Sequence, residues 1–181
     1  MTGGSPDAEL VGSARGGDRA AMNELVRRHH GVVFRTVLGI LSDEDDAADA
    51  TQETFIRAFA KLDGFRGEAK FRTWLLSIAT NQARGALRRT ARRREAPLLE
   101  EPRDEGLSGG NDPTERTGLE ERVRVFLARL PEKQRLAVTL RLFDGLSFRE
   151  VGVLIESSEG SARVNYHHGI RRLRGWMEEG T

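Results

Sequence analysis

Arginine and aromatic side chains gather in the stretch from residue 65 to residue 94, a combination suited to binding nucleic acid. The loop at its start carries Phe65, Arg66 and Lys70. Six arginines stand among its last eleven residues with no acid between them: Arg84, Arg88, Arg89, Arg92, Arg93 and Arg94. Guanidinium groups pair with phosphates, and aromatic faces stack on unpaired bases. The stretch therefore predicts contact with a strand of nucleic acid whose bases are exposed.

A second set of residues that could bind a partner is acidic and comes just before this stretch. The spacing of residues 43 to 62 predicts an amphipathic helix with two stripes. The polar stripe consists of Asp45, Asp49, Gln52 and Glu53, and the apolar stripe of Phe55, Ile56, Phe59 and Leu62. Ser42 is placed to cap this helix, and carboxylates in the first turn suit the helix dipole. The dipole does not explain Gln52 and Glu53, so a solvated helix start and a partner surface both remain open.

Further helices are expected to position these two sets of residues. The chain breaks at Asp63-Gly64, and a helix begins near Phe71. Its apolar stripe, expected to lie mostly in the core, consists of Phe71, Trp74, Leu75 and Ile78. Residues 7 to 41 predict a short helix, a break at Gly16-Gly17-Asp18 and a longer helix. The first domain is therefore expected to be a bundle of helices.

A second helical domain is expected after a segment with the composition of a linker. Residues 95 to 118 contain three prolines, several glycines and an excess of acids, which indicates a flexible acidic linker. An apolar stripe follows, made of Leu136, Leu140 and Phe143. Ser147 and Glu150 have the spacing of a capping box, and Ser158 is a second N-cap before a basic helix. Two such helices joined by a tight turn are typical of a helix-turn-helix.

The last helix has polar side chains where a recognition helix meets DNA. The candidates for base edges, near its N-terminal end, are Ser161, Arg163 and Asn165, and those for phosphates are His167, Arg171 and Arg172. Arginine can pair with guanine and asparagine with adenine, each contact contributing roughly 1–3 kcal/mol of discrimination. For any single residue, a solvated basic helix remains the alternative.

Composition and motifs exclude several other classes of protein. The net charge is only +1, but basic and acidic residues are segregated along the chain. Zero cysteines exclude disulfides and suit a cytoplasmic protein. No apolar run is long enough to span a membrane, so neither membrane insertion nor export is expected.

Catalysis and metal binding are not expected either. The pairs His29-His30 and His167-His168 invite a metal site, but adjacent residues point about 100° apart on a helix and no cysteine assists them. A phosphate-binding glycine loop, a nucleophile elbow and a carboxylate pair for acid–base work are all missing from the sequence. We therefore expect no enzyme, no metal and no cofactor.

Several motifs in combination resemble a known family. The first three are Asp49-x-x-Gln52-Glu53-x-Phe55, Phe65-Arg66-Gly67-Glu68-x-x-Phe71-x-Thr73-Trp74-Leu75 and Ile78-Ala79-x-Asn81-x-x-Arg84. Together they resemble the second conserved region of bacterial RNA polymerase sigma factors of the sigma-70 family, with the extracytoplasmic-function (ECF) group as the best match. The run Gly145-Leu146-Ser147-x-x-Glu150-Val151, with Ser158 to Arg163, resembles the fourth conserved region.

This resemblance implies an all-α protein of two small helical domains joined by a flexible linker. The implied divisions are a tail over residues 1–6, sigma region 2 over 7–94, the linker over 95–118 and sigma region 4 over 119–178. The implied function is promoter recognition: the protein binds RNA polymerase core, recognises the −10 and −35 elements and promotes DNA melting for transcription initiation. The implied partners are the clamp helices and flap of the large polymerase subunits, promoter DNA and an anti-sigma factor.

The resemblance also implies roles for individual residues. Core polymerase is bound by Asp49, Gln52 and Glu53. The −10 element is bound by Phe65, Arg66, Lys70, Phe71, Trp74, Asn81, Arg84 and Arg88, with Trp74 either a DNA wedge or a core residue. The −35 element is bound by Ser161, Arg163, Asn165, His167, Arg171 and Arg172. Both DNA-facing surfaces are expected to be exposed in the free protein.

Two other interpretations remain. A stand-alone helix-turn-helix regulator would explain residues 147 to 174 but leaves the acidic ridge and the aromatic loop without a role. A mimic that resembles a sigma factor in order to sequester an inhibitor would be favoured by loss of the basic residues, which are present in this chain.

Overall fold

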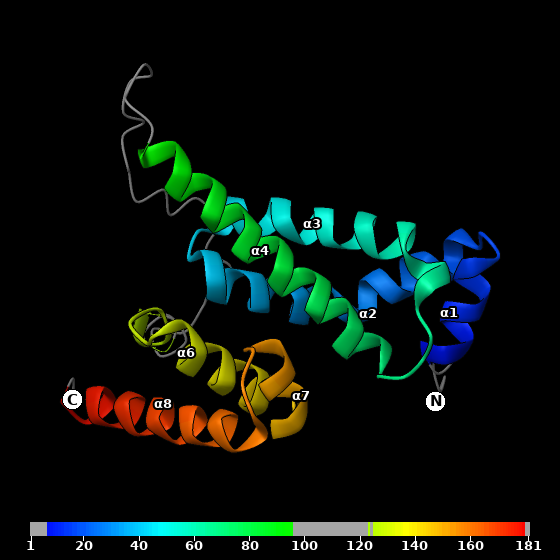
Figure 1. The fold of residues 1–181 in the computed structure, drawn as a ribbon. Coiled ribbons are helices and arrows are strands. Elements are labelled where there is room, and N and C mark those ends of the chain that lie inside the picture. Colours follow the sequence, from blue (N-terminus) through cyan, green and yellow to red (C-terminus); the bar gives the residue numbers. More distant parts are fainter. Residues whose placement is uncertain (1–6, 96–122, 124, 180–181) are drawn as a thin grey trace, which may run out of the picture.

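The structure, a computed structural model, describes residues 7–95, 123 and 125–179 and contains helices and turns but no strand over that part of the chain (Figure 1). The N-terminal domain consists of α1 (Asp7–Arg15), α2 (Arg19–Leu41), α3 (Glu44–Ala60), the 3-10 turn η1 (Leu62–Gly64) and α4 (Phe71–Glu95). The C-terminal domain contains α6 (Glu132–Val138), the π-helical turn η2 (Thr139–Phe143), α7 (Phe148–Leu154) and α8 (Glu159–Glu179). The expected all-α fold is confirmed, whereas the expected linker lies almost wholly outside the described residues.

The N-terminal domain is built around α2, which packs against α1, α3 and α4. Its apolar face supplies Leu25, Val33 and Val37, each completely buried. Leu75 and Leu76 of α4 are buried against them in the same core. Full burial of aliphatic side chains of this size stabilises a fold by roughly 1.5–3 kcal/mol each. The three long helices therefore hold the α3–α4 connection at one end of the bundle, next to α1 (Figure 1).

The helix starts differ in one place from the expected caps. The side chain of Asp18 accepts the backbone N–H groups of Ala20 and Ala21, which begins α2. For α3 the cap is Asp43, whose carboxylate accepts the N–H of Asp46 at 2.8 Å. Ser42 was the expected cap, but it lies in the left-handed region with φ 63° and ends α2 instead. The connection between α2 and α3 therefore consists of Ser42 and Asp43, one residue more than the pattern indicates.

The C-terminal domain packs α8 across α6 and α7 (Figure 1). The expected capping box is confirmed: the Ser147 hydroxyl accepts the N–H of Glu150, whose carboxylate accepts the N–H of Ser147. At Gly169 the helices approach closely, since a Cβ there would lie 2.6 Å from Val138 Cγ2. Phe143 departs from the apolar stripe that it was expected to form with Leu136 and Leu140, because η2 turns its side chain outward and leaves it 52% exposed. An extra residue in a π-helical turn shifts the helix register, which the 3.6-residue period cannot anticipate.

Polar contacts join the two domains. Arg35 of α2 pairs with the carboxylate of Asp144, and Arg72 of α4 donates to the Asp144 carbonyl at 3.0 Å. Thr73 donates its hydroxyl to Glu150 Oε1 at 3.1 Å. These contacts place the start of α4 against the start of α7, so the domains form one closed unit.

Candidate nucleic-acid interface and partner surfaces

The loop from Phe65 to Lys70 begins in a cluster of three aromatic rings, those of Phe65, Phe71 and Trp74. The centroid of the Phe65 ring lies 5.1 Å from that of Trp74 and 5.8 Å from that of Phe71. Phe65 and Trp74 are half-buried, and Trp74 packs against the core with one side. Phe71 is only 4% exposed, and its ring centroid lies 5.4 Å from that of His29, so its ring packs in the core as the apolar stripe of α4 predicted. Little of the Phe71 side chain is therefore accessible in the free protein, and its assignment to DNA stays a prediction.

The cations of this loop project into solvent. The Arg66 side chain is 83% exposed, and its guanidinium lies 4.0 Å from the carboxylate of Glu68. The Lys70 side chain is 74% exposed, with its ammonium 3.6 Å from Glu150 Oε1. Exposed ion pairs of this kind contribute at most about 1 kcal/mol. Both cations can therefore exchange their partners for phosphates.

The predicted −10 residues on α4 differ in their access to a ligand. Asn81 and Arg88 are exposed. The side chain of Arg84 is only 15% exposed, because it donates to Glu156 Oε1 at 2.6 Å and to Glu132 Oε1 at 3.1 Å. Both glutamates belong to the C-terminal domain. The expectation that the whole −10 face is exposed in the free protein is therefore wrong at Arg84.

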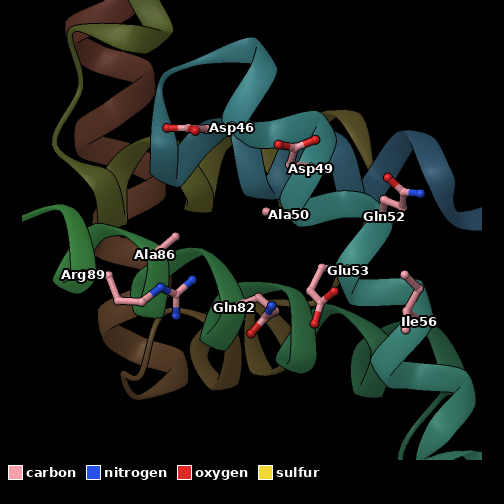
Figure 2. A pocket seen from close by; sticks show the side chains of 9 residues that line it. All are labelled: Asp46, Asp49, Ala50, Gln52, Glu53, Ile56, Gln82, Ala86 and Arg89. Carbon is pink, nitrogen blue, oxygen red and sulfur yellow. The ribbon is translucent and has the colours of Figure 1, made fainter. Parts of the chain in front are cut away.

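A groove between α3 and α4 carries the acidic ridge. It encloses about 490 Å³, and Asp49, Gln52 and Glu53 all line it. Figure 2 shows Glu53 of α3 and Gln82 of α4 facing the same space between the two helices. Its other lining residues, which sequence reasoning did not assign, are Asp46, Ala50, Ile56, Gln82, Ala86 and Arg89. The groove therefore joins a ridge on one helix to polar residues on the next.

The exposure of Ile56 explains why the apolar pattern of α3 did not reveal all the residues that line this groove. The apolar stripe of α3 was expected to include Ile56, but its side chain is 57% exposed whereas Phe55 is 6% exposed. Ile56 lies one turn after Gln52 and Glu53, on the polar side of the helix. An exposed isoleucine beside acids gives the groove an apolar contact for a partner.

The start of α8 carries the predicted base-reading residues. Arg163 pairs with Glu159 at 3.3 Å, and its guanidinium lies over the Phe148 ring, 5.1 Å from the centroid. The Asn165 amide nitrogen donates to the Ser161 carbonyl at 2.9 Å, so it must rotate to meet a base edge. The predicted phosphate-binding residues His167, Arg171 and Arg172 are exposed further along the helix.

Two residues beside these were missed by sequence reasoning. The guanidinium of Arg141 also lies over the Phe148 ring, 4.9 Å from its centroid. The Phe148 ring therefore makes cation–π contacts with Arg141 of η2 and Arg163 of α8. Val164, between Arg163 and Asn165, is an apolar side chain with 53% exposure. Single exposed valines are common on protein surfaces, and only the position of Val164 on this helix draws attention to it.

A second groove, mainly apolar, lies on the C-terminal domain. It encloses about 510 Å³ and is lined by Val123, Leu127, Val138, Leu142, Phe143, Ile170, Leu173, Arg174, Met177 and Glu178. Leu142 and Phe143 are more than half exposed at its edge. The outward turn of η2 creates this edge, so the groove could not be read from helical periodicity.

Two ionisable groups have shifted pKa values with clear causes. Burial raises the pKa of Glu150, but hydrogen bonds from Ser147 and Thr73 and the charge of Lys70 outweigh it and lower the pKa to about 2. Burial lowers the pKa of His29 below its ordinary value, although Asp7, whose carboxylate lies 2.9 Å from His29 Nε2, opposes this. Glu150 is therefore a carboxylate, and His29 a neutral ring, at neutral pH.

The histidine pairs form no metal site in the part of the chain that the structure describes. His29 Nε2 lies 2.9 Å from the carboxylate of Asp7, and the ring centroid of His167 lies 5.3 Å from that of Tyr166. Over residues 7–95, 123 and 125–179, no three histidines, aspartates or glutamates are grouped in a way that could hold a metal ion. The helices described in the structure are all too short or too polar to cross a membrane.

Comparison with known proteins gives matches over both domains. The family model for sigma-70 region 2 matches residues 25–93, and that for sigma-70 region 4 matches residues 120–173. The chain is 32% identical to the RNA polymerase sigma-H factor of Pseudomonas aeruginosa over 168 residues, covering 87% of this chain and 86% of that protein. It is 34% identical over 166 residues to the ECF RNA polymerase sigma-E factor of Escherichia coli K12, with coverage of 87% and 86%.

Solved structures share the fold. CnrH in complex with the cytosolic domain of CnrY matches with a TM-score of 0.69 and 23% identity, over 97% of this chain and 99% of that one. RpoE in complex with the anti-sigma factor NepR from Bartonella quintana matches with a TM-score of 0.68 and 19% identity, over 86% and 96%. Matched regions, relatives and fold agree with the motifs: the chain belongs to the sigma-70 family of RNA polymerase sigma factors, in its ECF group.

Proposed function

We propose that this sigma factor divides promoter recognition among three surfaces. The groove between α3 and α4 binds the clamp helices of core polymerase. The loop from Phe65 to Lys70, with Asn81, Arg84 and Arg88 of α4, binds and opens the −10 element. The first two turns of α8 read the −35 element. The protein supplies binding energy and no catalytic group of its own, and it acts in the cytoplasm.

One observation supports this proposal most directly: the α3–α4 pair carries both the groove proposed to bind polymerase and the loop proposed to bind DNA. Gln52 and Glu53 line the groove along the helices, whereas Phe65 and Arg66 lie in the connection at the end of α3. A clamp helix bound in the groove would leave the loop free. One rigid pair of helices can then hold the polymerase and the DNA at the same time.

The loop has the parts needed to hold an unstacked base. Phe65 and Trp74 offer ring faces that are half-exposed, and Arg66 and Lys70 offer cations beside them. Extruding a base from a duplex costs a few kcal/mol, and stacking on an aromatic ring returns about 1–3 kcal/mol per base. With phosphate contacts added, capture of one base can offset the cost of extruding it, which is proposed to start the opening of the −10 element.

The apolar groove of the C-terminal domain is proposed as the site of the polymerase flap. Leu142, Phe143 and Met177 offer exposed apolar side chains at its edge. A partner helix with an apolar face fits such a groove. An anti-sigma factor, proposed from the family, would act by covering this groove or the α3–α4 groove and so excluding polymerase.

The closed arrangement of the domains implies a change of shape before DNA is bound. Arg84 can reach a phosphate only after it leaves Glu132 and Glu156. Polymerase that holds the two domains at separate sites would break these pairs. The free protein is therefore proposed to bind promoters poorly, and the holoenzyme to bind them well.

The experiment is promoter opening by purified core polymerase with and without this protein. The DNA is a promoter selected from a randomised library by the holoenzyme, with a fluorescent base in its −10 element. Opening is expected only when both proteins are present. The variant Gln52→Ala plus Glu53→Ala is expected to weaken core binding about tenfold, which corresponds to about 1.4 kcal/mol.

A matched control is Glu9→Ala plus Asn23→Ala, which removes an acid and an amide that are exposed on α1 and α2. This pair is expected to open the promoter as the unmodified protein does. Duplex binding without core polymerase, and no opening with it, would instead support a stand-alone regulator. An equal loss in both double variants would remove the α3–α4 groove from the proposal.

A further inference from the structure

Arg15, the last residue of α1, reaches the chain that leads into the −10 loop. Its Nε donates to the Leu62 carbonyl at 3.1 Å, and its Nη2 donates to the Phe65 carbonyl. The two acceptors are 47 and 50 residues away along the sequence. A guanidinium group presents its donors in a rigid fork, so two carbonyls held by one arginine are fixed relative to each other.

Those two carbonyls mark the ends of η1. Leu62 begins this turn and is 2% exposed, and Phe65 follows directly after it. The ring of Phe65 is held by Trp74 and Phe71, and its carbonyl is held by Arg15. Arg66 is the next residue, so its direction of projection depends on the fixed Phe65 peptide.

The other end of α1 is also anchored beside the aromatic cluster. Asp7 binds His29 at 2.9 Å and Arg28 at 3.3 Å, and the His29 ring contacts Phe71 at 5.4 Å. α1 therefore connects to the base of the loop at both of its ends. Charged hydrogen bonds at two separated points resist sliding of the helix along its axis.

We propose that Arg15 is a positioning residue for −10 recognition: it holds the Phe65 backbone so that the loop is shaped for a base before DNA arrives. The inference deepens the proposed function, because it gives that function to α1, which precedes the part of the chain matched as region 2. Preorganised loops bind more tightly because less ordering is left to occur on binding.

The test compares Arg15→Ala and Arg15→Lys in holoenzyme with the unmodified chain. The probe is the labelled nontemplate single strand of the −10 element from the selected promoter. Arg15→Ala is expected to weaken binding of this strand by at least about tenfold, in line with the loss of a hydrogen bond from a charged donor. The affinity of Arg15→Lys for this strand is expected to lie between those of Arg15→Ala and the unmodified chain, because an ammonium cannot hold both carbonyls as a guanidinium fork does.

Three readouts separate positioning from general support of the fold. Affinity for core polymerase and for a −35 duplex is expected to stay within about twofold, since both sites lie away from η1. Emission of Trp74, measured with Trp176→Phe so that it is the one remaining tryptophan, is expected to change in Arg15→Ala. Arg19→Ala, at the exposed first residue of α2, is the control and is expected to leave every readout unchanged.

The outcomes distinguish failure of the positioning role of Arg15 from failure of the proposed function. Unchanged −10 binding in Arg15→Ala, or loss of core affinity in parallel with −10 affinity, would overturn the positioning role while leaving the sigma function intact. Failure of the unmodified holoenzyme to bind the −10 strand would overturn the proposed function itself.

Discussion

Nη1 of Arg84 lies 2.6 Å from Oε1 of Glu156, which ties a residue predicted to bind the −10 element to the domain predicted to bind the −35 element. Glu132 holds the same guanidinium from a second side at 3.1 Å. The residue is thus satisfied by protein in the free chain. We therefore predict that −10 DNA must compete with the C-terminal domain for Arg84.

The first prediction is that Glu132→Gln plus Glu156→Gln opens the protein. Loss of two partly exposed ion pairs, each contributing up to about 1 kcal/mol, should raise the separated fraction several-fold. The separation can be followed by fluorescence transfer between dyes on α2 and α8, and Glu178→Gln serves as control. Free-protein affinity for promoter DNA should rise in the same variant, and an unchanged dye distance would contradict the idea.

The second prediction concerns Val164 and the thymine methyl group that it is expected to contact. An exposed valine on a recognition helix can contact the 5-methyl group of thymine. Replacing one −35 thymine by deoxyuridine should therefore weaken binding about threefold, as expected for one buried methyl group. Val164→Ala should abolish this sensitivity, whereas Val153→Ala, at another exposed valine on α7, should retain it. Sensitivity to deoxyuridine that persists in Val164→Ala would sink the assignment.

The third prediction uses two glycines of α8. A Cβ at Gly169 would meet Val138 Cγ2 at 2.6 Å, whereas a Cβ at Gly175 meets no atom within 4 Å. Gly169→Ala should therefore destabilise the domain by about 1–3 kcal/mol through overpacking. Gly175→Ala should stabilise it by up to about 1 kcal/mol, since alanine favours helix. Thermal unfolding followed by circular dichroism measures both, and equal melting temperatures would count against the close approach of α6 and α8.

The fourth prediction concerns pH. The pKa of His29 is lowered by burial, with Asp7 opposing this effect and Arg28 and Arg72 adding to it. The unfolded chain therefore takes up a proton first as the pH falls. The stability contributed by neutral His29 is complete above its ordinary pKa of 6.5 and is lost as the pH falls through the lower folded value.

His29→Gln should flatten this part of the stability profile, while His30→Gln, which changes an exposed neighbour, should not. The measurement is urea unfolding at several pH values between about 7 and 5, with the slope compared rather than the absolute stability. An identical slope in His29→Gln and the unmodified protein would show that another group carries the acid sensitivity.

Much of the local structure could be predicted from the sequence, because it depends on nearby residues. The break at residues 16–18, the capping box of Ser147 and Glu150, and the helix from Phe71 are all signalled within a few positions. The family resemblance extended these to two domains of known type, and the matches over both regions confirm it.

Contacts between distant residues were the part that could not be predicted. Periodicity gives the stripe on which a side chain lies, but it does not show that Arg84 meets Glu132 and Glu156. The exposure of Phe143 follows from the π-helical turn η2. The assignments of individual residues to DNA or polymerase stay predictions.

Glu150 accepts the N–H of Ser147 to begin α7 and accepts the Thr73 hydroxyl from the other domain. A substitution there would loosen the domain contact and weaken the start of the helix-turn-helix together. We expect that a permanently open form that still reads DNA cannot be reached through Glu150, whereas substitution of Glu132 or Glu156 leaves the capping box of α7 intact. A single substitution of Glu150 is thus expected to weaken the domain contact and promoter reading together.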